Sequence, residues 1–135
     1  MRDVNSHDPA GTENQDVKLN LEKQVAAGVW IQVIGQLVEV ISLSKLLLLS
    51  ENVPSDSEKK AFYGVCIQAI GQLLEAAGVS QQLSTTNVES LIEGQEITIT
   101  GDWLQAIGAA VEATGAAGIL KEEIENIENV RGFIP

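Results

Sequence analysis

The sequence is poor in the residue types that build most active sites, with one cysteine and one histidine among 135 residues. A single cysteine excludes an intramolecular disulfide framework, and one cysteine with one histidine cannot form a Cys/His zinc site. Basic residues are also scarce, because 8 lysines and arginines face 19 aspartates and glutamates, for a net charge of −11. Nucleic acids and anionic lipids are bound through clustered Lys and Arg. The composition therefore argues against a nucleic-acid partner.

The short motifs that carry chemistry are absent as well. The chain contains no G-x-S-x-G elbow, no glycine-rich phosphate loop and no calcium-loop spacing. His7 has no candidate partner in the residues around it. We therefore predict no catalytic residue, no metal ligand and no cofactor, and we expect a protein that is not an enzyme.

The first 16 residues differ in composition from the rest of the chain. Five of them are charged, and they lack the apolar stretch of a secretory signal peptide. Because this segment has little to bury, we expect a disordered arm over 1–16 and a single helical domain over 17–135. The absence of a signal pattern predicts a cytoplasmic protein, with export by an unconventional route left open.

An internal repeat is the most specific feature that is present. Segments starting at Gly28, Gly64 and Gly101 share the pattern G-x-(W/C)-(I/L)-Q-(A/V)-I-G-x-x-x-E-(A/V), at offsets of 36 and 37 residues. We infer the duplication of one unit. The repeat units are predicted at about 17–53, 54–93 and 94–135.

Each repeat has the periodicity of a helix. In the first, apolar residues occupy positions 30, 31, 34, 37, 38 and 41, which is the 3.6-residue spacing of one helix face. No single unit can bury so wide a face, so neighbouring units must cover it. We therefore predict an all-α fold, a helical bundle or array built from three tandem repeats of about 36 residues.

A narrow stripe of glycine and long polar residues lies opposite the apolar face. Its glycines are Gly28, Gly35, Gly64, Gly71, Gly101 and Gly108. Its polar members are Gln32, Glu39, Gln68, Glu75, Gln105 and Glu112. Glycine inside a helix costs about 1 kcal/mol relative to alanine, whereas a bare Cα lets another helix approach closely. We interpret the glycines as a helix-packing interface. The alternative is that they are tolerated on a solvated surface.

The expected helix boundaries follow from proline and from capping patterns. The first helix is predicted over 17–50, because Pro54 cannot continue a helix. Ser55 and Glu58 form a capping-box pattern for a second helix that reaches about Gly78.

The last third of the chain is predicted to form several short secondary-structure elements rather than one long helix. Thr86 starts a capping-box pattern for a short helix, and residues 95–100 are left open between an extended segment and a loop. Thr100 is expected to cap a helix that ends near Gly115, followed by a helical segment over 119–130.

Two features bear on chemistry. If the stripes converge, Glu39, Glu75 and Glu112 could meet and bind a cation; we favour three solvated side chains instead. Cys66 occupies the position that tryptophan fills in the other two repeats, so we expect a buried apolar residue rather than a nucleophile.

The run from Val25 to Leu49 is long enough to cross a bilayer. Gln32, Glu39 and Lys45 interrupt it, and ionisable groups are costly inside a bilayer. A helix of a soluble bundle is the favoured interpretation, and membrane association stays possible.

The repeat pattern resembles that of small repetitive proteins from spore-forming Gram-positive bacteria. The resemblance rests on residues 28–35 and 101–108, and less well on 64–71, where cysteine replaces tryptophan. It implies a bacterial source and a repeat fold but no reaction. From the residues we expect a structural or interaction protein that forms homo-oligomers. The alternatives are a membrane-active helical protein and a carrier that holds a small apolar ligand between helices.

Overall fold

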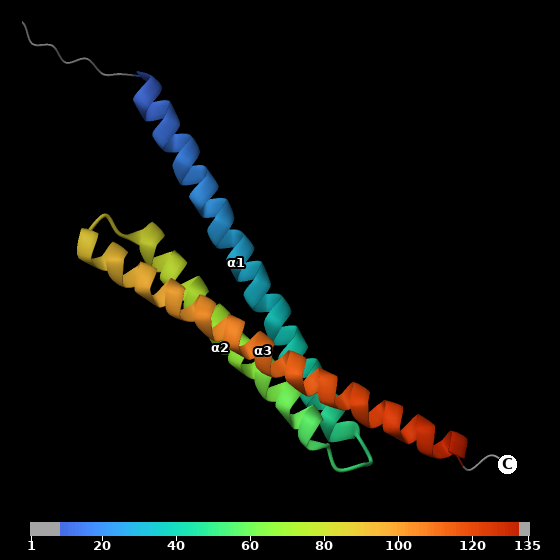
Figure 1. Ribbon diagram of the computed structural model, residues 1–135. Coiled ribbons are helices and arrows are strands. Elements are labelled where there is room, and N and C mark those ends of the chain that lie inside the picture. Colours follow the sequence, from blue (N-terminus) through green and yellow to red (C-terminus); the bar gives the residue numbers. More distant parts are fainter. Residues whose placement is uncertain (1–8, 133–135) are drawn as a thin grey trace, which may run out of the picture.

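The computed structural model describes residues 9–132, which form three long helices joined by short loops (Figure 1). Helix α1 spans Pro9–Leu49, α2 spans Asp56–Ser84 and α3 spans Val88–Gly132. The described part of the chain contains no strand, and the predicted all-α fold is confirmed.

Helix α1 begins earlier than the sequence predicted. Of the arm expected over 1–16, residues 1–8 lie outside the described residues, and residues 9–16 are helical rather than disordered. Proline is favoured in the first turn of a helix, where its missing N–H would have no partner in any case. Residues 11–25 are exposed, so this end of α1 extends without burying side chains.

Helix α2 begins where the capping box predicted. The side chain of Ser55 accepts from the backbone N–H of Glu58 at 3.2 Å, and the Glu58 carboxylate accepts from the Ser55 N–H at 2.7 Å. The helix ends at Ser84 and not near Gly78, which is an interior residue of α2.

Helix α3 is one continuous element where the sequence predicted separate pieces. Asn87, rather than Thr86, caps it, because the Asn87 Oδ1 accepts from the N–H groups of Glu89 at 2.9 Å and Ser90 at 3.4 Å. Residues 95–100 are helical.

The hydroxyls of Thr98 and Thr100 donate to the carbonyls of Gly94 and Glu96 at 3.0 and 2.8 Å. These bonds to the preceding turn accommodate β-branched residues within a helix. Thr100 is thus an interior residue and not the cap that we expected, and Gly115 does not end the helix.

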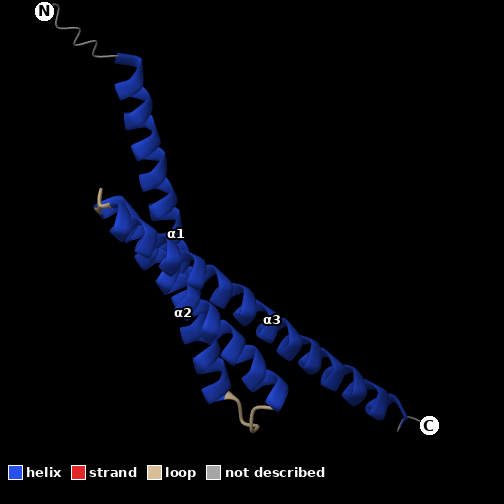
Figure 2. Cartoon of the chain, turned by 60° about the vertical axis from the view of Figure 1, so that its left-hand side comes forward, coloured by secondary structure: helices blue, strands red, loops and turns tan. Residues whose placement is uncertain are grey.

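Helices α2 and α3 run side by side in opposite directions, and α1 packs against α2 (Figures 1 and 2). Both views show the N-terminal half of α1 pointing away from this pair and the C-terminal end of α3 extending beyond α2. The small core between α1 and α2 contains Val29, Val33 and Ala76. The Trp30 Nε1 also donates to the Ser80 Oγ at 3.1 Å.

Most of the apolar face that we expected to be covered is exposed. Ile31 and Trp103 are 68% and 67% exposed, and Cys66, expected to be buried, is only half-buried. The reason is the open arrangement, in which the outer helices each leave one side without a neighbour.

Candidate helix-packing interface

The glycine stripes of α2 and α3 lie directly against each other. A Cβ atom added to Gly71 would lie 2.6 Å from the carbonyl oxygen of Gly101, and one added to Gly101 would lie 2.5 Å from that of Gly71. Real Cβ atoms do not approach other heavy atoms so closely. Both residues must therefore be glycine for the two backbones to keep this separation.

The same contact recurs one heptad away in each direction. A Cβ on Gly108 would lie 2.7 Å from the carbonyl oxygen of Gly64, and one on Gly64 would meet the backbone of Glu112. At the other end, a Cβ on Gly78 would lie 2.5 Å from the carbonyl oxygen of Gly94. The contact thus continues along the pair of helices over several turns.

The α2–α3 interface also contains four glycines that were not assigned to it from the sequence, namely Gly78, Gly94, Gly115 and Gly118. Gly78 and Gly115 were candidate helix ends, yet Gly115 packs on Ala61 and Ser57. Gly94 lies seven residues before Gly101, so the heptad spacing could have identified it. Gly118, which meets the Ser57 side chain, lies outside that spacing and carries no such signal.

The polar members of the stripes bond across the same interface. The Gln68 Nε2 donates to the Glu112 Oε2 at 2.5 Å, and the Gln105 Nε2 donates to the Glu75 Oε2 at 2.8 Å. Hydrogen bonds to an ionised carboxylate are among the stronger ones in proteins. Glutamine and glutamate therefore satisfy each other beside the glycines.

Burial and charge act on two ionisable groups near this interface. Burial raises the pKa of the Asp102 carboxyl, and the nearby Glu75 charge raises it further. Burial also raises the pKa of the Cys66 thiol, so its reactive thiolate form is disfavoured at neutral pH. These environments do not activate a nucleophile.

The stripe of α1 has a different environment. A Cβ added to Gly28 or Gly35 would meet nothing within 4 Å among the described residues. Glu39 accepts from Gln36 of its own helix at 3.0 Å, and the Gln32 side chain is exposed. Two of the six predicted interface glycines therefore lie on an open helix face.

The three stripe carboxylates do not converge. Glu75 and Glu112 each bond to a glutamine of the opposite helix, and Glu39 lies on α1. Within residues 9–132, no group of three or more His, Cys, Asp or Glu side chains could hold a metal ion.

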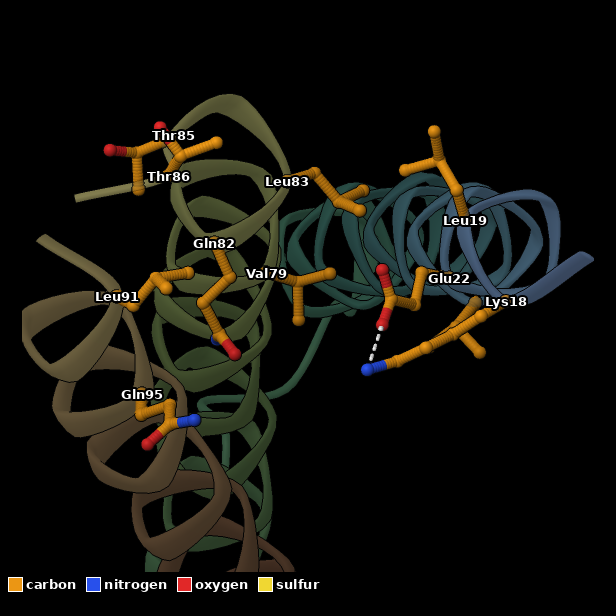
Figure 3. A pocket seen from close by; sticks show the side chains of 11 residues that line it. Lys18, Leu19, Glu22, Val79, Gln82, Leu83, Thr85, Thr86, Leu91 and Gln95 are labelled. Atoms are coloured by element: carbon orange, nitrogen blue, oxygen red, sulfur yellow. Dashed lines mark ion pairs between the residues drawn. The ribbon is translucent and has the colours of Figure 1, made fainter. Parts of the chain in front are cut away.

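The described part of the chain has hollows beside α1, and two of them are well defined. The larger, of about 720 Å³, opens between the N-terminal half of α1 and the loop end of the α2–α3 pair, where Lys18 and Glu22 form an ion pair at 3.6 Å (Figure 3). The smaller, of about 290 Å³, is lined mostly by apolar side chains such as Leu47 and Phe62, with Glu58 and Glu112 also in its wall. It lies at the lower limit of ligand pockets in size.

All three helices are long and apolar enough to cross a membrane, judged by length and composition. In the most apolar 18-residue window of α1, only 17% of the residues are buried. Most of the residues in this apolar window are therefore exposed.

The fold and the packed stripes define an all-helical protein organised around a glycine-lined antiparallel helix pair. The chain belongs to a family of unknown function, DUF6944, whose match covers residues 13–113. No curated protein and no solved structure matches it.

Proposed function

We propose that this protein is a non-enzymatic structural or interaction protein that acts by self-association. The observation that carries the proposal is the open stripe of α1. A Cβ added to Gly28 or Gly35 would meet nothing within 4 Å in the described part of the chain, whereas the matching glycines of α2 and α3 are covered by another helix backbone. A helix surface that is covered in two of its three occurrences is expected to be covered in the third.

The exposed area supports the same proposal. The accessible surface is 10194 Å², whereas a compact monomer of this mass exposes roughly 6,800 Å². Ile31 and Val38 each follow a stripe glycine of α1 by three residues, so they border the stripe, and they are 68% and 59% exposed. Association would remove such side chains from water, and apolar burial is the main favourable term in protein association.

Sedimentation equilibrium of the full chain tests the proposal. We expect a mass above the 14.4 kDa of one chain at tens of micromolar, with dissociation on dilution. A mass of 14.4 kDa at every concentration up to roughly 100 micromolar, where modest association energies already populate dimers, would refute self-association.

A membrane-associated role is the second candidate. It is supported by the three helices whose length and apolar composition suit a bilayer and whose apolar windows are mostly exposed. Flotation with neutral and with anionic vesicles separates the two proposals. Self-association predicts that the chain stays in the aqueous fraction with both. Membrane association predicts that it floats with either kind, since the net charge of −11 provides no preference for anionic lipid.

We further propose that the protein is one of the small repetitive proteins of spore-forming Gram-positive bacteria and that it is cytoplasmic. The recurring G-x-(W/C)-(I/L)-Q-(A/V)-I-G pattern supports the first point. Immunodetection in fractionated cells of the source organism tests the second, and a signal in the medium or the membrane fraction would contradict it.

A further inference from the structure

We propose that two chains pair through the stripes of their α1 helices, antiparallel and about a two-fold axis. In this pair Gly28 lies against the partner's Gly35, and Gln32 donates a hydrogen bond to the partner's Glu39. The inference rests on the proposed self-association and specifies its surface, orientation and register.

The α2–α3 pair provides the template, because it is symmetric at the stripe positions. The first stripe glycine of α2, Gly64, lies against the second of α3, Gly108. The second stripe glycine of α2, Gly71, lies against the first of α3, Gly101. Exchanging the two helices leaves this arrangement unchanged. Such a pair is the covalently linked equivalent of a two-fold dimer, in which one surface contacts itself.

The hydrogen bonds between the stripes have the same two-fold symmetry as the glycine contacts. In one direction Gln68 of α2 donates to Glu112 of α3, and in the other Gln105 of α3 donates to Glu75 of α2. In both cases the first polar residue of one stripe bonds to the second polar residue of the other.

Helix α1 carries both halves of this interface. In the aligned pattern Gly28, Gln32, Gly35 and Glu39 match Gly64, Gln68, Gly71 and Glu75 of α2, and Gly101, Gln105, Gly108 and Glu112 of α3. Glu75 accepts from Gln72 of its own helix and from Gln105 of α3. Of the donors that the structure describes, Glu39 accepts from Gln36 alone, so the position that Gln105 occupies at Glu75 is open at Glu39.

The occupant of the α1 stripe is another α1, because the stripes of α2 and α3 already cover each other in every chain. The α1 stripe is also accessible, since α1 meets α2 through a different face that contains Ala26, Val29 and Val33. Two chains joined in this way have used their free stripes, so the assembly closes at a dimer.

The closest approach is confined to the central turns of α1. Leu21 stands where α2 has Ser57 and α3 has Gly94, so a bulky side chain occupies the end of the α1 stripe. Its exposed fraction is 55%. Because the two-fold axis places one Leu21 at each end of the interface, the two helices must separate toward both ends, and the Gly28–Gly35 segment carries the contact.

A charge exchange tests the register. Gln32→Glu places carboxylates opposite each other at two symmetric sites, and we expect a dimer dissociation constant at least about tenfold weaker. Adding Glu39→Gln to the same chain restores opposite donor and carboxylate groups, and we expect dimerisation to recover. Ala27→Glu, which adds the same charge at an exposed position off the stripe, is the matched control. Unchanged dimerisation of Gln32→Glu, or no recovery in the double variant, would overturn this register.

Cysteine cross-linking tests the orientation. The α2–α3 equivalents of Val25 and Ser42 lie in direct backbone contact, because a Cβ on Gly115 would lie 2.7 Å from the Ala61 Cα, and Gly78 packs on Thr98 in the same way. A disulfide needs Cα atoms roughly 4.4–6.8 Å apart, so this pair stays within reach when Leu21 moves the two α1 helices apart by about 2 Å. In a Cys66→Ala background, we expect an equimolar mixture of Val25→Cys and Ser42→Cys chains to form a disulfide-linked dimer under mild oxidation, and neither chain alone to do so.

Cross-linking of Val25→Cys with itself would indicate a parallel dimer and overturn the orientation while self-association stands. A wild-type mass of one chain at all concentrations would instead refute the proposed function together with this inference. The two failures are thus distinguishable.

Discussion

The α2–α3 pair and helix α1 carry the same sequence pattern in two different environments. In the pair, each stripe glycine is in contact with the backbone of the opposite helix, and each stripe glutamine between the glycines bonds to a glutamate across the interface. In α1 a Cβ added to the corresponding glycines would meet no other described residue within 4 Å, and the corresponding glutamine is exposed. The comparison teaches that the pattern encodes a surface complementary to itself, and that three occurrences leave one without a partner.

The glycines affect the folding free energy differently in the two regions, because only those of α2 and α3 are packed against another helix. Each interior glycine costs a helix about 1 kcal/mol relative to alanine. In α2 and α3 the close packing of the two backbones offsets this cost. In α1, Gly28 and Gly35 carry this cost with no compensating backbone contact from residues 9–132. Substitutions at matching positions should therefore have opposite effects in the two regions.

The largest effect is expected for Gly71→Leu. Its Cβ would lie 2.6 Å from the Gly101 carbonyl oxygen and 2.8 Å from the Gln105 nitrogen, and neither backbone atom can move unless the helices separate. Overpacking of this kind typically costs about 1–3 kcal/mol, and we expect the upper end of that range. Urea denaturation followed by circular dichroism measures it. An unfolding free energy equal to or above that of the wild type would show that the α2–α3 contact is not close.

An intermediate effect is expected for Gln105→Met. This substitution keeps the side-chain length and removes the donor to Glu75, so we expect the unfolding free energy to fall by about 1–2 kcal/mol. The matched substitution Gln32→Met should change the stability of the monomer by less than about 0.5 kcal/mol, because Gln32 is exposed. Both are measured by urea denaturation at a concentration where the chain is monomeric. Equal losses at the two positions would contradict the difference between the regions.

The smallest effect is expected for Asp102→Asn at the edge of the pair. The pKa of Asp102 is raised in the folded chain, so the wild type loses stability as the pH rises through that pKa and the carboxyl ionises. Asparagine avoids this loss, and we expect a gain of less than about 0.5 kcal/mol at pH 7 for an exposed position. The gain should vanish below the ordinary aspartate pKa of 3.8. Thermal melts at pH 7 and pH 3 measure the difference, and a gain that persists at pH 3 would refute the electrostatic cause.

The helical class and the start of α2 were predictable from the sequence, because both depend on local signals. The 3.6-residue periodicity indicated helices, and the Ser55–Glu58 capping box predicted the observed cap. The continuity of α3 was not predictable from local signals. Gly94, Gly115 and the threonines near residue 98 are typical of helix ends, and they are helical here because α2 packs against the glycines and the threonine hydroxyls bond to the preceding turn.

The sequence also identified the residues of the stripes, but it did not predict which stripes pack against each other. Periodicity places Gly64 and Gly108 on equivalent faces, but it does not state which helices meet or that they run in opposite directions. That choice follows from the three-residue connection between α2 and α3, which favours antiparallel neighbours. The exposed side chains of Ile31 and Trp103 were assigned to a core because periodicity identifies an apolar face and not the neighbour that covers it.

The mass of the Gly35→Leu variant tests the central claim most directly, because the monomer has open space at this position. We expect the wild type to dimerise and Gly35→Leu to sediment as a single chain of 14.4 kDa, with undiminished helix content and a melting temperature no lower than that of the dissociated wild type. Ala27→Leu, an exposed position off the stripe, should keep the wild-type mass. A Gly35→Leu chain that retains the assembled mass would contradict the claim that the open stripe of α1 is the interface between chains.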